Sequence, residues 1–395
     1  MHSVVIVGAS LAGFSAAQAF RRYGFDGKIT IVGDESHLPY QRPPLSKQFL
    51  SGEWDRARLD LRIADGLQLE WLLGARAHSL DLSRREVKLA DKRRLRFDGL
   101  VIATGARARK PRWYVELDGV FTLRTVDDAL ALRTRLGSGK RKVAIVGAGF
   151  IGSETAATLR KLDCDVTLID LDPLPMLRVL GEKLGSVCLR LHESHGVHTF
   201  FGVAVDALLG STSVEGVRLE DGRVIEADCV VVGVGVIPNV EWLQGSGLVL
   251  EDGVACDAAC AALGGESVVA AGDVARWEHP HYGRRRVEHW NNAIAQGDAA
   301  AQTLLSPPGD ARSYAAIPFF WSDQYDCKLQ LIGVPQPGDT IRVVEGALGE
   351  QRFVTLFERD GRAIGAFLFN STHRVAAYRQ TIETGVTGLA EGAAA

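Results

Sequence analysis

The sequence predicts an α/β fold in which one βαβ unit occurs twice, followed by a smaller α+β domain. A short apolar strand, a glycine-rich loop and a helix occur at the start of the chain and again near residue 147. Each copy is followed by a hairpin, another apolar strand and an edge of small residues, which indicates duplication of a whole domain. After residue 309 the pattern changes to strand-like runs.

The first copy begins with an apolar strand at Ser3–Val7. We predict a helix up to about residue 23 and a second strand at Lys28–Val32. The loop between the first strand and the helix is a candidate phosphate-binding turn, formed by Gly8, Ala9, Ser10, Leu11, Ala12 and Gly13. Ser10 replaces the middle glycine of G-x-G-x-x-G, but serine is small enough to allow close approach.

The second copy, residues 142–170, has the stricter motif. A strand at 143–146 leads to the glycines of G-x-G-x-x-G, which are Gly147, Gly149 and Gly152. They permit a tight turn, close approach of a pyrophosphate and packing of helix on strand. A helix over 150–162 would then offer its N-terminus to the phosphates.

Asp170 ends the next predicted strand, 166–169, about 20 residues beyond the glycines. Its carboxylate can accept hydrogen bonds from a ribose and would repel a 2′-phosphate, which favours NADH over NADPH. The two copies together predict two Rossmann-like dinucleotide-binding domains. The alternative is one bound dinucleotide and one copy that is only structural.

Composition excludes several classes of function. The net charge of −3 argues against general nucleic-acid binding, and no apolar segment is long enough to span a bilayer. The first strand begins at once, which leaves no room for a targeting peptide. Six scattered cysteines without Cys-x-x-Cys suit reduced thiols. We therefore expect a cytoplasmic protein without a metal site.

Residues 37–47 form a loop with two adjacent prolines, which cannot sit inside a helix or a central strand. Ser46 could cap the next turn. The loop leaves the carboxyl edge of the sheet, so Arg42 and Lys47 would direct positive charge at a cofactor. The alternative is a solvated basic loop.

Further elements repeat in both halves. Hairpins are predicted around Asp91 and at Asp221-Gly222, and a helix over 126–136 lies between them. Buried strands at 100–103 and Cys229–Val232 lead to two edges of small residues, which are Ala103-Thr104-Gly105 and Gly233-Val234-Gly235. A basic run over 107–112 is typical of a solvated face.

A strand at 268–271 ends at Gly272-Asp273, where a carboxylate can hold sugar-like hydroxyls. A helix from Trp290 to about residue 304 could stabilise negative charge on a reduced ring. The alternative is a strand-end cap and an ordinary helix. Residues 306–309 read as a linker. Antiparallel strands are predicted after the linker, at 328–333, 341–344, 352–358 and 363–369. A helix over 374–384 and a loose tail over 390–395 follow them.

These motifs resemble the FAD-dependent, NADH-using ferredoxin reductases, which serve Rieske-type dioxygenases and bacterial cytochromes P450 and share the glutathione reductase fold. The resemblance covers essentially the whole chain, and its most specific part is the loop Arg42-Pro43-Pro44-Leu45-Ser46-Lys47. It also includes both glycine loops, Leu123-Arg124-Thr125, Gly272-Asp273 and Phe320-Trp321-Ser322-Asp323.

The resemblance implies an FAD-binding domain (1–111 and 241–311), an NADH-binding domain (112–240) and a C-terminal α+β interface domain (312–395). FAD would be held by Gly8, Ser10, Leu11, Ala12, Gly13, Asp34, Glu35, Arg42, Pro43, Lys47, Ala77, Ala103, Thr104, Gly105, Arg124, Gly272, Asp273, Trp290 and Trp321. NADH would be held by Gly147, Gly149, Phe150, Ile151, Gly152, Glu154, Asp170, Gly233, Val234 and Gly235.

The missing cysteines define the subclass. Disulfide reductases of this fold carry a redox cysteine pair beside the flavin, but the first cysteine here is Cys164. Hydride would therefore pass from NADH to flavin N5, with Lys47 and Glu154 setting polarity there, and single electrons would pass to a 2Fe–2S ferredoxin. The implied enzyme is a monomeric or homodimeric NAD(H):ferredoxin oxidoreductase.

Trp290, Trp321 and the third domain would line the ferredoxin docking face. Residues 284–286 are three arginines, which either steer an acidic ferredoxin or form a solvated turn. The alternative functions are a rubredoxin reductase, an NADH oxidase-type flavoprotein, and an NAD(H)-sensing protein like the apoptosis-inducing factors.

Overall fold

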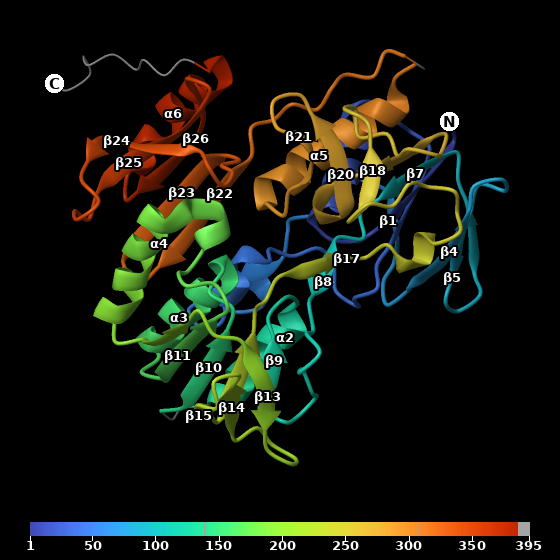
Figure 1. Ribbon diagram of the computed structural model, residues 1–395. Helices are drawn as coiled ribbons and strands as arrows, with labels where there is room; N and C mark the ends of the chain where they lie inside the picture. The colour runs from blue at the N-terminus through green and yellow to red at the C-terminus, as the bar shows by residue number, and fades with distance from the viewer. Residues whose placement is uncertain (138–139, 308, 386–395) are drawn as a thin grey trace. The chain divides into compact units, whose positions relative to one another are not determined.

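The computed structural model describes residues 1–137, 140–307 and 309–385, which fold into two compact units (Figure 1). Unit 1 comprises Met1–Gln41, Leu59–Arg107 and Ile237–Pro318. Unit 2 comprises Arg42–Arg58, Ala108–Val236 and Phe319–Ala395. The chain passes between units at residues 41–42, 58–59 and 318–319, and also within strands β8 (Ala106–Ala108) and β17 (Val236–Pro238).

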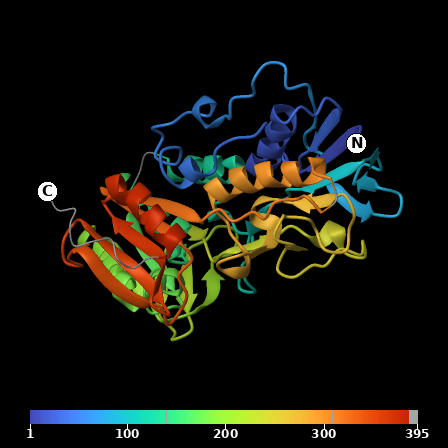
Figure 2. The same ribbon diagram turned by 90° about the horizontal axis from the view of Figure 1, so that it is seen from above.

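Unit 1 is built on a parallel sheet of order β19-β7-β1-β2-β3. Its strands are β1 (Ser3–Val7), β2 (Lys28–Val32), β3 (Leu69–Leu72), β7 (Gly99–Ile102) and β19 (Val268–Ala270). Val4 and Ile6 face helices α1 (Leu11–Arg22) and α5 (Trp290–Leu305), which run side by side (Figure 2). Val5 and Val7 face a second core on the other side of the sheet, so the apolar run is buried on both faces.

Two smaller sheets complete unit 1. The antiparallel sheet comprises β4 (Ala77–Asp81), β5 (Glu86–Leu89) and β6 (Arg94–Arg96). The mixed sheet comprises β18 (Val254–Cys256), β20 (Ala275–His279) and β21 (Gly283–Arg286). Short 3₁₀ turns lie at Ala57–Leu59, where the chain enters unit 1, and at Glu241–Leu243 and Gly272–Val274.

Unit 2 repeats the architecture with a parallel sheet of order β12-β11-β10-β16-β9. Its strands are β9 (Val120–Thr122), β10 (Lys142–Val146), β11 (Asp165–Asp170), β12 (His198–Phe201) and β16 (Cys229–Val232). The other elements are η1 (Pro43–Ser46), α2 (Val126–Leu136), α3 (Phe150–Lys161), α4 (Leu177–Ser194), β13 (Val205–Leu209), β14 (Gly216–Leu219) and β15 (Val224–Glu226).

The C-terminal part of unit 2 is an antiparallel sheet of order β22-β23-β26-β25-β24. It comprises β22 (Phe319–Gln324), β23 (Cys327–Gly333), β24 (Thr340–Gly346), β25 (Phe353–Arg359) and β26 (Arg362–Phe369), followed by η5 (Thr372–Arg374) and α6 (Val375–Thr384). One face packs on the apolar side of α4 through an aromatic core that includes Phe353 and Phe367.

The predicted fold class is confirmed, and most predicted elements lie within two or three residues of the observed ones. Two local predictions are wrong. Ser46 caps no following turn, because it ends η1 and its side chain donates elsewhere. Residues 284–286 form strand β21 rather than a turn. The predicted tail at 390–395 lies outside the described residues.

Candidate functional site

The first glycine loop lies between β1 and α1, and its backbone requires two of its glycines. Gly8 has a φ of +126°, and a Cβ on it would lie 1.9 Å from the carbonyl oxygen of Ala103. A Cβ on Gly13 would lie 1.9 Å from the oxygen of Gly8. Ser10 is the N-cap of α1, but its side chain makes no capping hydrogen bond to the helix. The helix N-terminus therefore keeps backbone N–H groups for an anion.

The parallel register of unit 1 brings its candidate residues to one sheet edge. Val7 pairs with Val32 and Ile102, and Ile102 pairs with Ala270, so the loops after these four strands meet there. These loops carry Gly8–Gly13, Asp34, Glu35, Ala103, Thr104, Gly105, Gly272 and Asp273. The carboxylate of Asp34 is exposed, whereas that of Glu35 accepts a 2.5 Å hydrogen bond from the hydroxyl of Tyr40.

Two side chains that the sequence analysis missed hold this edge in shape. Asn239 and Thr104 bond each other reciprocally, each side chain donating to the other's carbonyl oxygen at 2.9 and 2.8 Å. Gln296 on α5 accepts a 2.9 Å hydrogen bond from the N–H of Gly272. Asn239 and Gln296 belong to no recognised motif, so no local signal in the sequence identified them.

Two other candidates in unit 1 lie on separate elements. Trp290 is the first residue of α5. Ala77 begins β4 in the antiparallel sheet rather than lying at the parallel edge. The chain just before it returns to that edge, because the N–H of Ala75 donates to the oxygen of Gly33 at 2.7 Å. The roles predicted for both residues stay predictions.

The second glycine loop has the same backbone constraints and one difference. A Cβ on Gly147 would lie 2.3 Å from the oxygen of Gly233, and a Cβ on Gly152 would lie 1.9 Å from the oxygen of Gly147. A Cβ on Gly149, by contrast, would meet no atom within 4 Å in the described structure. The middle glycine therefore leaves space that the fold does not need, which fits a close approach by a pyrophosphate.

Asp170 at the end of β11 is tied to this loop. Its two carboxylate oxygens accept hydrogen bonds from the N–H groups of Ala148, at 2.5 Å, and Asp172, at 2.9 Å. Beside them Ile151 and Leu171 are exposed apolar side chains, with 44% and 61% of their surface accessible. Gly233, Val234 and Gly235 follow β16, whose register with β10 places them at the same edge.

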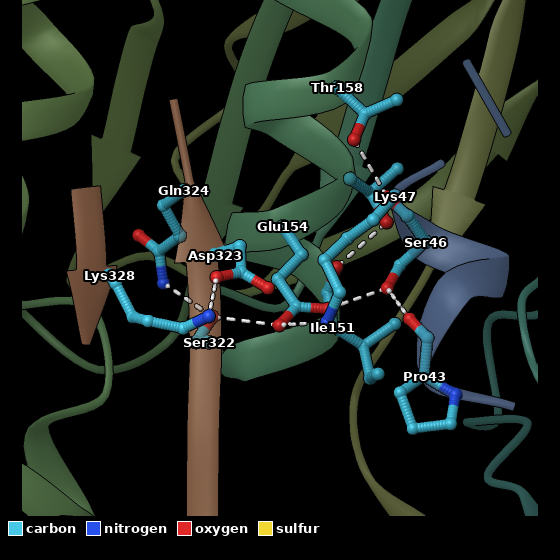
Figure 3. Close-up of polar contacts among 11 residues, drawn as sticks. Pro43, Ser46, Lys47, Ile151, Glu154, Thr158, Ser322, Asp323, Gln324 and Lys328 are labelled. Atoms are coloured by element: carbon cyan, nitrogen blue, oxygen red, sulfur yellow. Dashed lines mark hydrogen bonds and ion pairs between the residues drawn. The ribbon is translucent and has the colours of Figure 1, made fainter. Parts of the chain in front are cut away.

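A buried polar cluster surrounds the carboxylate of Glu154 on α3 (Figure 3). The ammonium of Lys47 lies 3.0 Å from Oε1. Ser46 donates to Oε2 at 2.6 Å, and Ser322 on β22 donates to Oε1 at 2.8 Å. Lys47 is only 9% exposed and Glu154 2%. Each buried charge therefore depends on the other for compensation.

The sequence around Ser46 explains how it reaches α3. Pro43 and Pro44 occupy the first positions of η1, where a missing N–H costs nothing. The carbonyl of Ser46 then accepts a 2.8 Å hydrogen bond from Thr158, one turn beyond Glu154 on α3. The short 3₁₀ helix therefore presents Ser46 and Lys47 to the same helix face.

Three further candidates lie in unit 2. Arg42 donates to the carbonyl oxygen of Arg124 at 2.8 Å, just before α2. Thr125 caps α2 in a reciprocal capping box with Asp128. Trp321 lies on β22 beside Ser322, and its ring stacks on Phe319 with centroids 6.2 Å apart.

All six cysteines are buried and free. Burial raises the pKa of the Cys188 thiol to about 12 and also raises that of Cys164. A reactive cysteine needs a stabilised thiolate, and these side chains have the opposite environment.

The arginines of β21 are engaged with acids of unit 1. Arg284 forms ion pairs with Glu251 and Glu278, both at 3.3 Å. Arg286 forms ion pairs with Asp252 and Glu288. Much of the positive charge of this triplet is therefore locally compensated.

No helix in the described ranges is long and apolar enough to cross a membrane. Residues 2–297 match the family model described as pyridine nucleotide-disulphide oxidoreductase, and residues 319–394 match the model described as reductase C-terminal.

Individual relatives agree along nearly the whole chain. Rhodocoxin reductase of Rhodococcus erythropolis is 37% identical over 388 residues, covering 97% of this chain and 90% of the relative. The ferredoxin–NAD(+) reductase component of the anthranilate 1,2-dioxygenase system of Burkholderia cepacia is 37% identical over 387 residues, covering 96% and 94%. The solved covalent putidaredoxin reductase–putidaredoxin complex contains a chain with a TM-score of 0.92 and 32% identity, covering 97% of this chain and 93% of that one.

Proposed function

Since the chain belongs to the pyridine nucleotide-disulphide oxidoreductase family, we propose that it passes electrons from NADH through bound FAD to a 2Fe–2S ferredoxin. The ferredoxin would serve an oxygenase, either a Rieske dioxygenase or a cytochrome P450. Curated relatives of similar length are named as ferredoxin–NAD(+) reductases of dioxygenase systems, which supports this reading.

One observation carries the choice within the family. No cysteine precedes Cys164 in the sequence, and all six thiols are buried. A disulfide reductase needs a dithiol beside its flavin to receive the electrons. Because this chain lacks that relay in its first half, its acceptor must be an external redox partner, which favours a ferredoxin.

The residues present fit a flavin and a nicotinamide dinucleotide. Two helix N-termini follow glycine loops without a side-chain cap, and the space beside Gly149 is free of protein atoms in the described structure. We assign FAD to the edge residues of unit 1. The proposed contribution of Arg42, Pro43, Lys47, Arg124 and Trp321 to FAD binding is based on the sequence resemblance alone. We assign NADH to the second glycine loop, Asp170 and residues 233–235.

A bound flavin would supply the chemistry of accepting two electrons from NADH and releasing them one at a time. In that reaction Glu154 holds Lys47 in one position by a buried ion pair. Lys47 supplies a fixed positive charge where negative charge develops. Asp170 favours NADH, because its carboxylate would repel a 2′-phosphate.

The test is an anaerobic titration of the purified flavoprotein with NADH, followed by addition of a 2Fe–2S ferredoxin. We expect bleaching of the flavin by NADH and rapid reoxidation by ferredoxin. Rapid reoxidation by oxygen alone would indicate an oxidase, and preference for rubredoxin would indicate a rubredoxin reductase. A stable charge-transfer complex with slow turnover would indicate a sensor. A protein without flavin would contradict the proposal.

We further propose a cytoplasmic location, which agrees with the buried, unpaired thiols. The oligomeric state, monomer or homodimer, can be measured by light scattering on the same sample.

A further inference from the structure

The C-terminal sheet meets the helix of the second glycine loop at two matched points. Phe150 and Glu154 are one turn apart on α3, and Phe320 and Ser322 are two residues apart on β22. The rings of Phe150 and Phe320 have centroids 3.9 Å apart, and Ser322 donates to Glu154 at 2.8 Å. Four helical residues rise about 6 Å and two strand residues about 6.6 Å, so both contacts fit one register.

The hydroxyl of Ser322 accepts one hydrogen bond and donates another. Gln324 donates to the Ser322 oxygen at 3.1 Å, so the hydroxyl accepts there and donates its own proton to Glu154; both contacts are drawn in Figure 3. Ser322 is fully buried. It shares the oxygen Oε1 of Glu154 with Lys47, and Ser46 bonds Oε2. Three donors from two segments, residues 46–47 and strand β22, therefore fix both oxygens of one carboxylate.

We propose that Ser322 is a positioning residue for NADH oxidation, acting through Glu154 on Lys47. It lies beside Trp321, which projects from the opposite face of β22 because strand residues alternate. The hydrogen bond from Ser322 to Glu154 thus joins the C-terminal domain to the Lys47–Glu154 ion pair, which is proposed to act during hydride transfer. The inference rests on the proposed function, since it assigns Ser322 a part in that same reaction.

Thr355 provides the matched control. It is a fully buried hydroxyl residue on β25 whose side chain has no hydrogen-bond partner within the described ranges. The strand pairings run from Phe320 to Leu331, from Leu331 to Phe367 and from Phe367 to Thr355, so Thr355 lies on the same sheet face as Ser322. Thr355→Val removes a hydroxyl from the same core without touching Glu154.

The experiment compares Ser322→Ala, Ser322→Thr and Thr355→Val with the wild-type holoenzyme. Anaerobic stopped-flow at several NADH concentrations separates the limiting rate of flavin reduction from the apparent Kd for NADH. Spectroelectrochemistry gives the flavin midpoint potential as a readout independent of turnover. If the wild type is not reduced by NADH, the proposed function fails; a difference among variants tests only the role of Ser322.

We expect Ser322→Ala to lower the limiting rate at least tenfold, with the apparent Kd within twofold of wild type and a more negative potential. Ser322→Thr keeps the donor and should recover the rate to within about threefold. Thr355→Val should stay within twofold. A limiting rate for Ser322→Ala equal to that of Thr355→Val would overturn the proposal.

If the Ser322→Ala protein does not retain flavin, the Gln324→Leu variant tests the positioning role of Ser322 instead. This change removes the donor that orients the Ser322 hydroxyl and deletes a buried amide whose oxygen has no partner in the described structure. We expect a limiting rate two- to fivefold below that of Thr355→Val. Equal rates would overturn the proposal by this route as well.

Discussion

The two glycine loops of this chain have nearly the same backbone and differ at their middle residue. In both, the first and third glycines have no room for a Cβ, because backbone oxygens lie 1.9 to 2.3 Å from where it would be. The middle position is Ser10 in unit 1 and Gly149 in unit 2. The fold therefore requires the first and third glycines, whereas a Cβ at Gly149 would meet no protein atom within 4 Å in the described structure.

The largest effect should come from a fold glycine. We expect Gly152→Ala to cost more than about 4 kcal/mol of unfolding free energy or to prevent folding, because the clash is with backbone that cannot rotate away. Gly149→Ala is the control within the same loop and should cost less than about 1 kcal/mol. Urea unfolding followed by circular dichroism measures both. Equal losses would break the distinction between the two kinds of glycine.

Unit 2 also carries a buried histidine on helix α4, which packs against the C-terminal sheet. His192 is fully buried and bonds the hydroxyl of Tyr325 at 2.8 Å. Burial, with a smaller effect of His195, lowers the pKa of His192 to about 4. In the unfolded chain His192 binds a proton near pH 6.5, whereas in the folded protein it does so only near pH 4. The free energy of unfolding therefore falls as the pH drops from about 6.5 to 4.

We expect His192→Gln to remove roughly 3 kcal/mol of that pH dependence, as measured by denaturant unfolding at pH 7 and pH 4. The pKa values of His279 and His289 are also lowered to about 4, but these residues titrate in both proteins and cancel in the comparison. The same slope in both proteins would show that His192 is accessible to protons in the folded state.

A change at the middle position should sharpen the comparison of the loops. Gly149→Ser gives the second loop the residue of the first. Since the new side chain would enter the space assigned to the pyrophosphate, we expect NADH affinity to fall about tenfold, or about 1.4 kcal/mol. Flavin content and unfolding midpoint should stay unchanged. Titration of flavin bleaching gives the affinity, and unaltered binding would show that NADH does not approach this backbone closely.

The smallest effect is expected at the arginines of β21, which lie far from either glycine motif in sequence. Replacing Arg284, Arg285 and Arg286 by Ala should change ferredoxin turnover less than twofold at low salt, because acids of unit 1 already pair with Arg284 and Arg286. Steady-state kinetics at two ionic strengths test this. A large fall in ferredoxin turnover at low salt that disappears at high salt would support a steering role for these arginines.

The sequence was sufficient for features that depend on neighbouring residues. Apolar runs such as Ser3–Val7 and Lys142–Val146 became central strands, and the glycines marked both loops. The α/β fold with its C-terminal sheet followed from that pattern. The resemblance directed attention to Lys47 and Glu154, which are in direct contact.

Features that depend on distant partners could not be predicted. Ser322 lies in the motif Phe320-Trp321-Ser322-Asp323, but its partner Glu154 is 168 positions away, and nothing local to either residue encodes the contact. Ser46 was interpreted as a cap because serine has that local preference, whereas the buried carboxylate of Glu154 offers a stronger, charge-assisted bond. The ion pairs of Arg284 with Glu251 and of Arg286 with Asp252 join residues 33 and 34 positions apart, so nothing local to the arginines indicated them.

The buried cysteines give each unit its own reporter of opening. Cys256 and Cys260 belong to unit 1, and Cys164, Cys188, Cys229 and Cys327 belong to unit 2. A thiol-specific reagent cannot reach any of them until the surrounding core opens. Pulsed alkylation in mild denaturant, followed by peptide mass spectrometry, would therefore record separately how often each half of this electron-transfer protein unfolds.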